Sequence, residues 1–155
     1  MINIIDYTVS RTQFAGVNTI PMALTNKKDN TFYHQLGKLF YAVAAADNIV
    51  KDEEFSRLQS CIHDYWLDLD DLEDAFGSDA AYLIEIVFEG VEAFNEDPQD
   101  MYDAFITYRN ERPQFFTLEV KNIILQTAWT IARAFSDVNK SELVMLGKLE
   151  IALSH

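Results

Sequence analysis

Carboxylates at the bend of a predicted helical hairpin are the residues of this sequence with the clearest potential chemistry. In the stretch 39–58, LFYAVAAADNIVKDEEFSRL, a helix rich in small residues ends near Asp47, and a second helix starts at Asp52, Glu53 and Glu54. The helix dipole opposes a carboxylate at a helix C-terminus, so Asp47 needs a turn N–H group, Lys51 or a cation as partner. Carboxylate and carbonyl oxygens without nearby His or Cys favour Ca²⁺, Mg²⁺ or Mn²⁺ over Zn²⁺.

Helix capping is a second explanation for two of the acids. Asn139 and Glu142 have the spacing of a capping box, in which the Glu side chain accepts from a free backbone N–H group at the helix start. Glu54 occupies the matching third position of its own helix. Capping accounts for Glu54 and Glu142 without any ion, so both explanations stay open at this point.

The elements that must position these acids are all helical. Apolar residues recur at spacings of three and four. The expected caps are Asp29 or Asn30, Asp97 and Asn139, and Gly and Pro delimit other segments. The expected helices span about 30–46, 52–66, 79–96, 98–112, 115–135 and 140–153, with a short helix that ends at Gly77. We therefore predict an all-α bundle of about six to seven helices over residues 28–155, preceded by an extended arm over residues 1–27.

The apolar patterns also predict which side chains are buried. Helix 79–96 should bury Phe94 with its apolar stripe, helix 140–153 should bury Leu143 and Ile151 with Leu146 and Leu149, and helix 115–135 should be central because it is apolar on most sides.

The two ends of the chain carry similar hairpins. A shift of 88 positions places seven residues of the first hairpin on similar residues of the second, including Glu54 on Glu142. The pattern predicts two hairpins that pack face to face with approximate two-fold symmetry and bring their bends together.

The run AVAAADNIVKDEEFSRL and the closing run IARAFSDVNKSELVMLGKL resemble the two hairpins of TerB-like proteins, the helical family associated with tellurite resistance. The resemblance implies a stress-associated adaptor with an acidic, metal-binding cluster. It assigns Asp47, Glu54 and Glu142 to that cluster, with Asp137 two residues past the counterpart of Asp47. The chain departs from the family pattern at Asn48, where Gly is usual, at Lys51 and at Phe135.

The net charge of −13 is concentrated in the middle of the chain. Fourteen carboxylates and no Lys or Arg lie between Arg57 and Arg109, and a predicted helix presents Glu85, Glu89, Glu92 and Glu96 on one face. Such a field repels nucleic acid and attracts cations or a basic protein partner.

Other functional classes find little support. No metalloprotease, nucleophile-elbow, phosphate-loop or dinucleotide motif occurs, so we predict no enzymatic activity, with a metal-dependent hydrolase as the minor alternative. No apolar run is long enough to span a bilayer and no export signal is evident, so we expect a cytoplasmic protein. The leading hypothesis is a TerB-like adaptor that binds a divalent cation weakly, and the alternative is an acidic protein that binds a basic partner.

Overall fold

The computed structural model describes residues 28–69 and 79–155, which form six α-helices and no β-sheet. The helices are α3 (Asn30–Ala44), α4 (Asp52–Cys61), α5 (Leu83–Ala93), α6 (Pro98–Glu111), α7 (Leu118–Ala132) and α8 (Lys140–Leu153). A π-helical turn, η1 (Ile62–Trp66), extends α4, and the 3₁₀ turns η2 (Ala80–Tyr82) and η3 (Pro113–Phe115) precede α5 and α7. The predicted all-α class is confirmed. The predicted arm 1–27 and most of the short helix ending at Gly77 lie outside the described residues.

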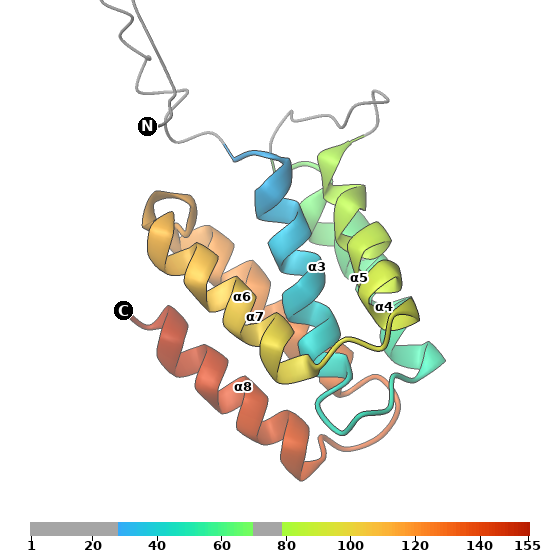
Figure 1. The fold of residues 1–155 in the computed structure, drawn as a ribbon. Coiled ribbons are helices and arrows are strands. Elements are labelled where there is room, and N and C mark those ends of the chain that lie inside the picture. Colours follow the sequence, from blue (N-terminus) through green and yellow to red (C-terminus); the bar gives the residue numbers. More distant parts are fainter. Residues whose placement is uncertain (1–27, 70–78) are drawn as a thin grey trace, which may run out of the picture.

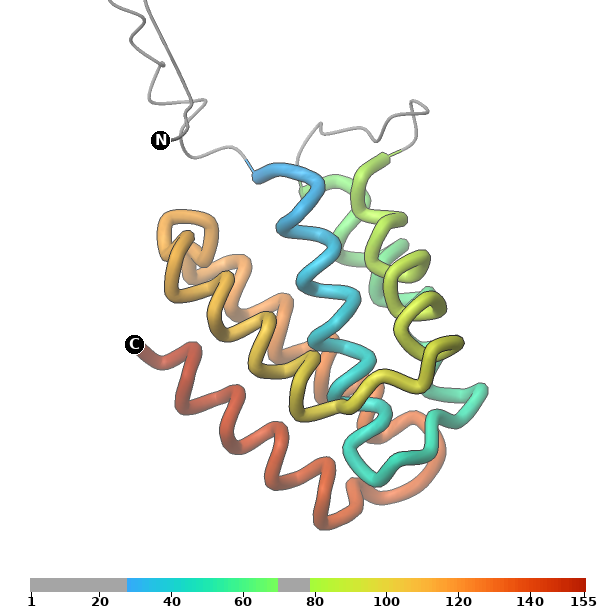
Figure 2. Tube along the Cα trace, in the orientation of Figure 1, coloured from blue at the N-terminus to red at the C-terminus, as the bar shows by residue number. Residues whose placement is uncertain are grey.

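Successive helices of the described chain alternate in direction. Helices α3, α5 and α7 run toward one end of the bundle, and α4, α6 and α8 return from it (Figure 1; Figure 2). As a result, the connections α3–α4, α5–α6 and α7–α8 gather at the same end. We call this end the connection end.

Polar side chains cap α3, α6 and α8 where the sequence predicts them, whereas α7 starts at Leu118, three residues later than expected. Asp29 accepts from the N–H group of Phe32 at 3.0 Å, and Asp97 accepts from that of Asp100 at 3.0 Å. The side chains of Thr117 and Asn139 cap α7 and α8 in the same way. Each cap satisfies a backbone donor that the helix itself leaves without an acceptor.

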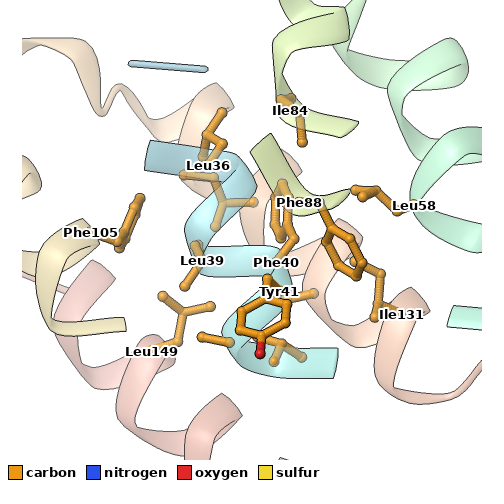
Figure 3. Packing of buried hydrophobic residues seen from close by; sticks show 14 of the residues in the cluster. Leu36, Leu39, Phe40, Tyr41, Leu58, Ile84, Phe88, Phe105, Ile131 and Leu149 are labelled. Atoms are coloured by element: carbon orange, nitrogen blue, oxygen red, sulfur yellow. The ribbon is translucent and has the colours of Figure 1, made fainter. Parts of the chain in front are cut away.

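Helix α3 is the central helix of the bundle, because it contacts α5, α6, α7 and α8. Its side chains Leu36, Leu39, Phe40 and Tyr41 meet residues from all the surrounding helices (Figure 3). The prediction that helix 115–135 is central was wrong, because Leu118 and other positions of α7 face solvent. Apolar residues on most sides of a helix did not suffice to identify the central one.

Close packing of α5 on α3 depends on Gly37. A Cβ atom at this position would lie 2.7 Å from the carbonyl oxygen of Ile84 and 2.8 Å from Cβ of Val87. Only a residue without a side chain lets the two backbones approach this closely.

Three side chains predicted to be buried are exposed. Phe94 follows the last residue of α5 and is 81% exposed, whereas Ile84 and Phe88 form the buried stripe of that helix. On α8 the buried face is instead formed by Glu142, Met145, Leu146, Leu149 and Leu153. Leu143 and Ile151 therefore fall outside that face and contact solvent. No helix in the described part of the chain is long and apolar enough to cross a membrane.

Candidate functional site

The connection end holds two acidic features. One joins the α3–α4 connection (residues 45–51) to the α7–α8 connection (residues 133–139), and the other is a pocket between the α3–α4 and α5–α6 connections. Both are formed by residues that are distant in sequence.

The first feature contains a complete capping box at the start of α8 and half of one at the start of α4, where the Lys51 side chain has no acceptor to offer the helix. At the start of α4, the backbone N–H group of Lys51 donates to Oε1 of Glu54 at 2.8 Å. At the start of α8, the N–H group of Asn139 donates to Oε1 of Glu142 at 3.0 Å, and Asn139 Oδ1 accepts from the N–H group of Glu142 at 2.9 Å. The capping role predicted for both Glu residues is confirmed. The two helix starts are related by the shift of 88 positions.

Asp47 connects the two hairpins. Its Oδ1 accepts from the N–H group of Ile49 at 3.0 Å, and its Oδ2 lies 3.4 Å from Nζ of Lys51. The same Oδ2 also accepts from Nδ2 of Asn139 at 3.0 Å, across 92 residues of sequence. Asp47 thus has both of its predicted internal partners and a third partner from the other hairpin.

The counterpart of Asp47 in the second hairpin is aromatic. Phe135 lies 88 positions after Asp47, and the Lys51 ammonium lies 5.4 Å from the centre of its ring. The Lys51 ammonium is therefore held between a carboxylate and an aromatic face, which attract it by charge and by the ring quadrupole. The correspondence between the two hairpin sequences therefore ends at this pair of positions.

Glu54 and Glu142 hydrogen-bond to each other in the interior. Their residues are only 1% and 2% exposed. Burial raises the pKa of Glu54, the hydrogen bond from Lys51 N–H lowers it in part, and the hydrogen bond to Glu142 and the charge of Glu142 raise it further, to about 8. At neutral pH Glu54 therefore holds a proton, as expected for a buried carboxyl group that shares a site with a second one.

Together these contacts form a closed ring that we call the corner ring. It runs through Asp47, Asn139, Glu142, Glu54 and Lys51. A buried pair of carboxyl groups is tolerated only when its oxygens have hydrogen-bond partners and at most one of the two carries charge. The ring meets both conditions with residues from both hairpins.

The predicted metal ligands are brought together only in part. Asp47, Glu54 and Glu142 all belong to the corner ring, whereas Asp137 is exposed in the α7–α8 connection, and its carboxylate is not part of the ring. Over residues 28–69 and 79–155, no group of three His, Cys, Asp or Glu residues has an arrangement that could hold a metal ion. The ring oxygens are instead used by the internal donors described above.

The second feature is a pocket of about 420 Å³. We call it the acidic pocket. It is lined by Tyr41, Ala45, Asn48, Val50, Glu92, Asn95, Glu96, Asp97 and Pro98. Asn48 and Asn95 have positive φ angles of 67° and 52° and turn the chain on two sides of it. The Tyr41 hydroxyl donates to the Glu96 carbonyl oxygen at 2.7 Å and fixes the α5–α6 connection against α3.

The acids of the pocket are not balanced by bases. None of the lining residues is Lys or Arg. Burial raises the pKa of Glu92, and the charges of Asp52 and Glu89 raise it further. Burial also raises the pKa of Tyr41, with added effects from Glu92, Glu96 and Asp97. The potential within the pocket is therefore negative.

The four predicted partner-binding residues occupy two places on α5 and the connection that follows. Glu92 and Glu96 line the acidic pocket, whereas Glu85 and Glu89 do not line it and lie nearer the start of the helix. Sequence reasoning missed Tyr41, Asn48 and Asp97 as pocket residues. Asp97 was identified only as a cap, and no local signal connects Tyr41 to residues 55 positions away.

Comparison of the chain with family models, curated proteins and solved structures found no match.

Proposed function

We propose that this chain is a non-enzymatic binding module that recognises a basic protein partner through the acidic pocket and the adjoining face of α5. The acidic pocket carries this proposal, because it combines a concave surface with unbalanced negative charge. Glu92, Glu96 and Asp97 are exposed, and no Lys or Arg lines the pocket with them. Such a surface favours a partner that supplies the missing positive charge.

The arrangement of the hairpins supports a TerB-like architecture for the module. Two hairpins of similar sequence pack with their bends in contact, as the resemblance implies, and Glu54 and Glu142 occupy equivalent places. The contacts of these two acids support a structural role, since each caps a helix and both are buried. The adaptor role therefore rests on the exposed acids of α5 rather than on the corner ring.

A labelled oligoarginine peptide provides the test. Fluorescence anisotropy should show saturable binding that weakens steeply as salt increases, because the contacts are electrostatic. A variant with Glu85, Glu89, Glu92 and Glu96 all changed to Gln should lose most of this affinity.

The matched control removes four exposed acids at the opposite end of the bundle. It combines Asp64→Asn, Asp68→Asn, Glu111→Gln and Glu119→Gln, all at exposed positions, so that the change in net charge is the same. The control variant should bind as the native chain does. Equal losses in the two variants would show that net charge alone attracts the peptide and would contradict the proposal.

A further inference from the structure

Resting on the proposed function, we infer that the acidic pocket receives one cationic side chain of the partner, Lys or Arg. Apolar residues next to that side chain in the partner contact Phe94 and Ile49. The inference concerns how the partner is recognised. It distinguishes a defined side-chain pocket from a diffuse attraction to the whole acidic face.

The charges of the pocket fit a single cation at the end of a long side chain. Glu92, Glu96 and Asp97 come from the end of α5 and the connection after it, so three acidic residues line one concave surface, and the Asp97 carboxylate also caps α6. The nearest Lys in sequence, Lys51, is directed elsewhere, since its ammonium group contacts Asp47 and the Phe135 ring. No internal cation among the lining residues competes for the site.

Two large exposed apolar residues are sequence neighbours of residues that line the pocket. Phe94 precedes the lining residue Asn95 and is 81% exposed, and Ile49 follows the lining residue Asn48 and is 61% exposed. Both belong to turns whose left-handed Asn residue reverses the chain. Exposed apolar residues close in sequence to a charged pocket are typical of a binding interface. In such an interface the aliphatic part of the partner's Lys or Arg side chain, and the partner residues next to it, are buried together with the charged group.

Rigid support makes the pocket a preformed site. Tyr41 is buried on the central helix, and its hydroxyl holds the Glu96 backbone. The ring of Tyr41 also packs edge to face on Phe88 of α5, with centroids 5.8 Å apart. A site whose walls are fixed in this way loses little conformational entropy when it is occupied.

The experiment uses n-butylammonium and n-butylguanidinium as side-chain probes in a two-dimensional NMR titration of the full chain, against NaCl at equal ionic strength. Shifts should saturate at Tyr41, Asn48, Asn95 and Glu96. Chemical-shift changes that do not saturate with either probe would overturn the inference. Changes of the same pattern in titrations with NaCl or Ca²⁺ would also overturn it.

Matched variants then separate the inference from the proposed function. Glu92→Gln with Glu96→Gln should weaken probe binding by about tenfold, because two carboxylates at contact distance are lost. Glu85→Gln with Glu89→Gln makes the same charge change on the same helix and should leave probe binding within about twofold, since those carboxylates lie outside the pocket. If both pairs of substitutions weakened the binding of the probe and of oligoarginine equally, the acidic pocket would not be the recognition site. The whole acidic face would then remain as the binding surface. If neither pair of substitutions nor the fourfold variant weakened oligoarginine binding, the proposed function itself would be contradicted.

The part assigned to Phe94 and Ile49 is tested by comparing the affinities of two peptides. The peptide Ac-Leu-Arg-Leu-NH₂ should bind more tightly than Ac-Ala-Arg-Ala-NH₂, and Phe94→Ser should remove that difference. The matched substitution Leu118→Ser changes another exposed apolar residue, at the start of α7, and should preserve it. Equal affinity of the two peptides for the native chain would overturn the part assigned to Phe94 and Ile49.

Discussion

The shared proton of the corner ring predicts that this protein loses stability as the pH rises from mildly acidic to mildly alkaline. The perturbation is the removal of the proton between Glu54 and Glu142. Above the pKa of the folded pair, two buried carboxylates face each other, and the remaining partners are the backbone donors of Lys51 and Asn139. The native state therefore resists losing this proton, and the unfolded chain does not.

The sign follows from the direction of the shift. The pKa of Glu54 is raised from 4.5 to about 8, so the folded state holds a proton that the unfolded state releases between these values. The stabilising contribution is complete below pH 4.5, decreases as the pH rises, and is lost once the pH passes about 8. Each pH unit in this window lowers the free energy of unfolding by about 1.4 kcal/mol. Over the whole window the loss is at most about 5 kcal/mol, a large part of the stability of a small domain.

The variant Glu54→Gln isolates this effect from the many other carboxylates. Its carbonyl oxygen can still accept from Lys51 N–H, and its amide can donate to the Glu142 carboxylate without any titrating proton. The variant should match the native chain near pH 5 and exceed it in stability by a few kcal/mol near pH 9.

Urea unfolding followed by the fluorescence of buried Trp66 and by circular dichroism gives the measurement. Glu53→Gln is the matched control, because Glu53 is the exposed neighbour at the same helix start, and it should shift stability by less than about 0.5 kcal/mol at every pH. Parallel curves for the native chain and Glu54→Gln from pH 5 to pH 9 would refute the shared proton.

Three further predictions concern the same architecture. Glu142→Gln should stabilise the chain at pH 9 as Glu54→Gln does. In the double variant one amide N–H₂ group can donate to the other side chain, but the second has no acceptor in the pair, so this variant should be less stable than either single variant by about 1 to 3 kcal/mol in urea unfolding. The weak binding of Ca²⁺, Mg²⁺ or Mn²⁺ predicted from the sequence stays a prediction. Binding of such an ion at the corner ring must displace the Glu54 proton, so calorimetry in buffers of different ionisation enthalpy should show proton release near pH 7. The binding signal should be lost in Asp47→Asn. Gly37→Ala should destabilise the fold by about 1 to 3 kcal/mol in thermal unfolding, because the added Cβ would meet α5. Gly147→Ala should stabilise the fold by about 0.5 to 1 kcal/mol, because no atom lies within 4 Å of the added Cβ. Comparable effects at both positions would contradict the close approach of α3 and α5.

Local signals in the sequence predicted the helices and the starts of α3, α4, α6 and α8, whereas α5 and α7 start a few residues later than expected. The caps Asp29, Asp97 and Asn139 act over three residues, and the periodicity of apolar side chains acts over one or two turns, so both are legible without the fold. The same kind of reasoning predicted that Glu54 and Glu142 accept from backbone N–H groups. It failed for Phe94 and Leu143, because burial depends on which neighbouring helix covers a face.

The sequence by itself determined the helical class, the concentration of negative charge, the equivalence of the two hairpins and the capping role of their Glu residues. These properties depend on composition and on contacts within a few residues. Only the tertiary structure decided that α3 is central, that Glu54 and Glu142 meet and share a proton, and that Tyr41 and Asn48 join Glu92 and Glu96 around one pocket. Those relations depend on the packing of helices far apart in the chain. A carboxylate acquires an unusual pKa only when other segments exclude water from it, and acids line one pocket only when the fold brings their segments together.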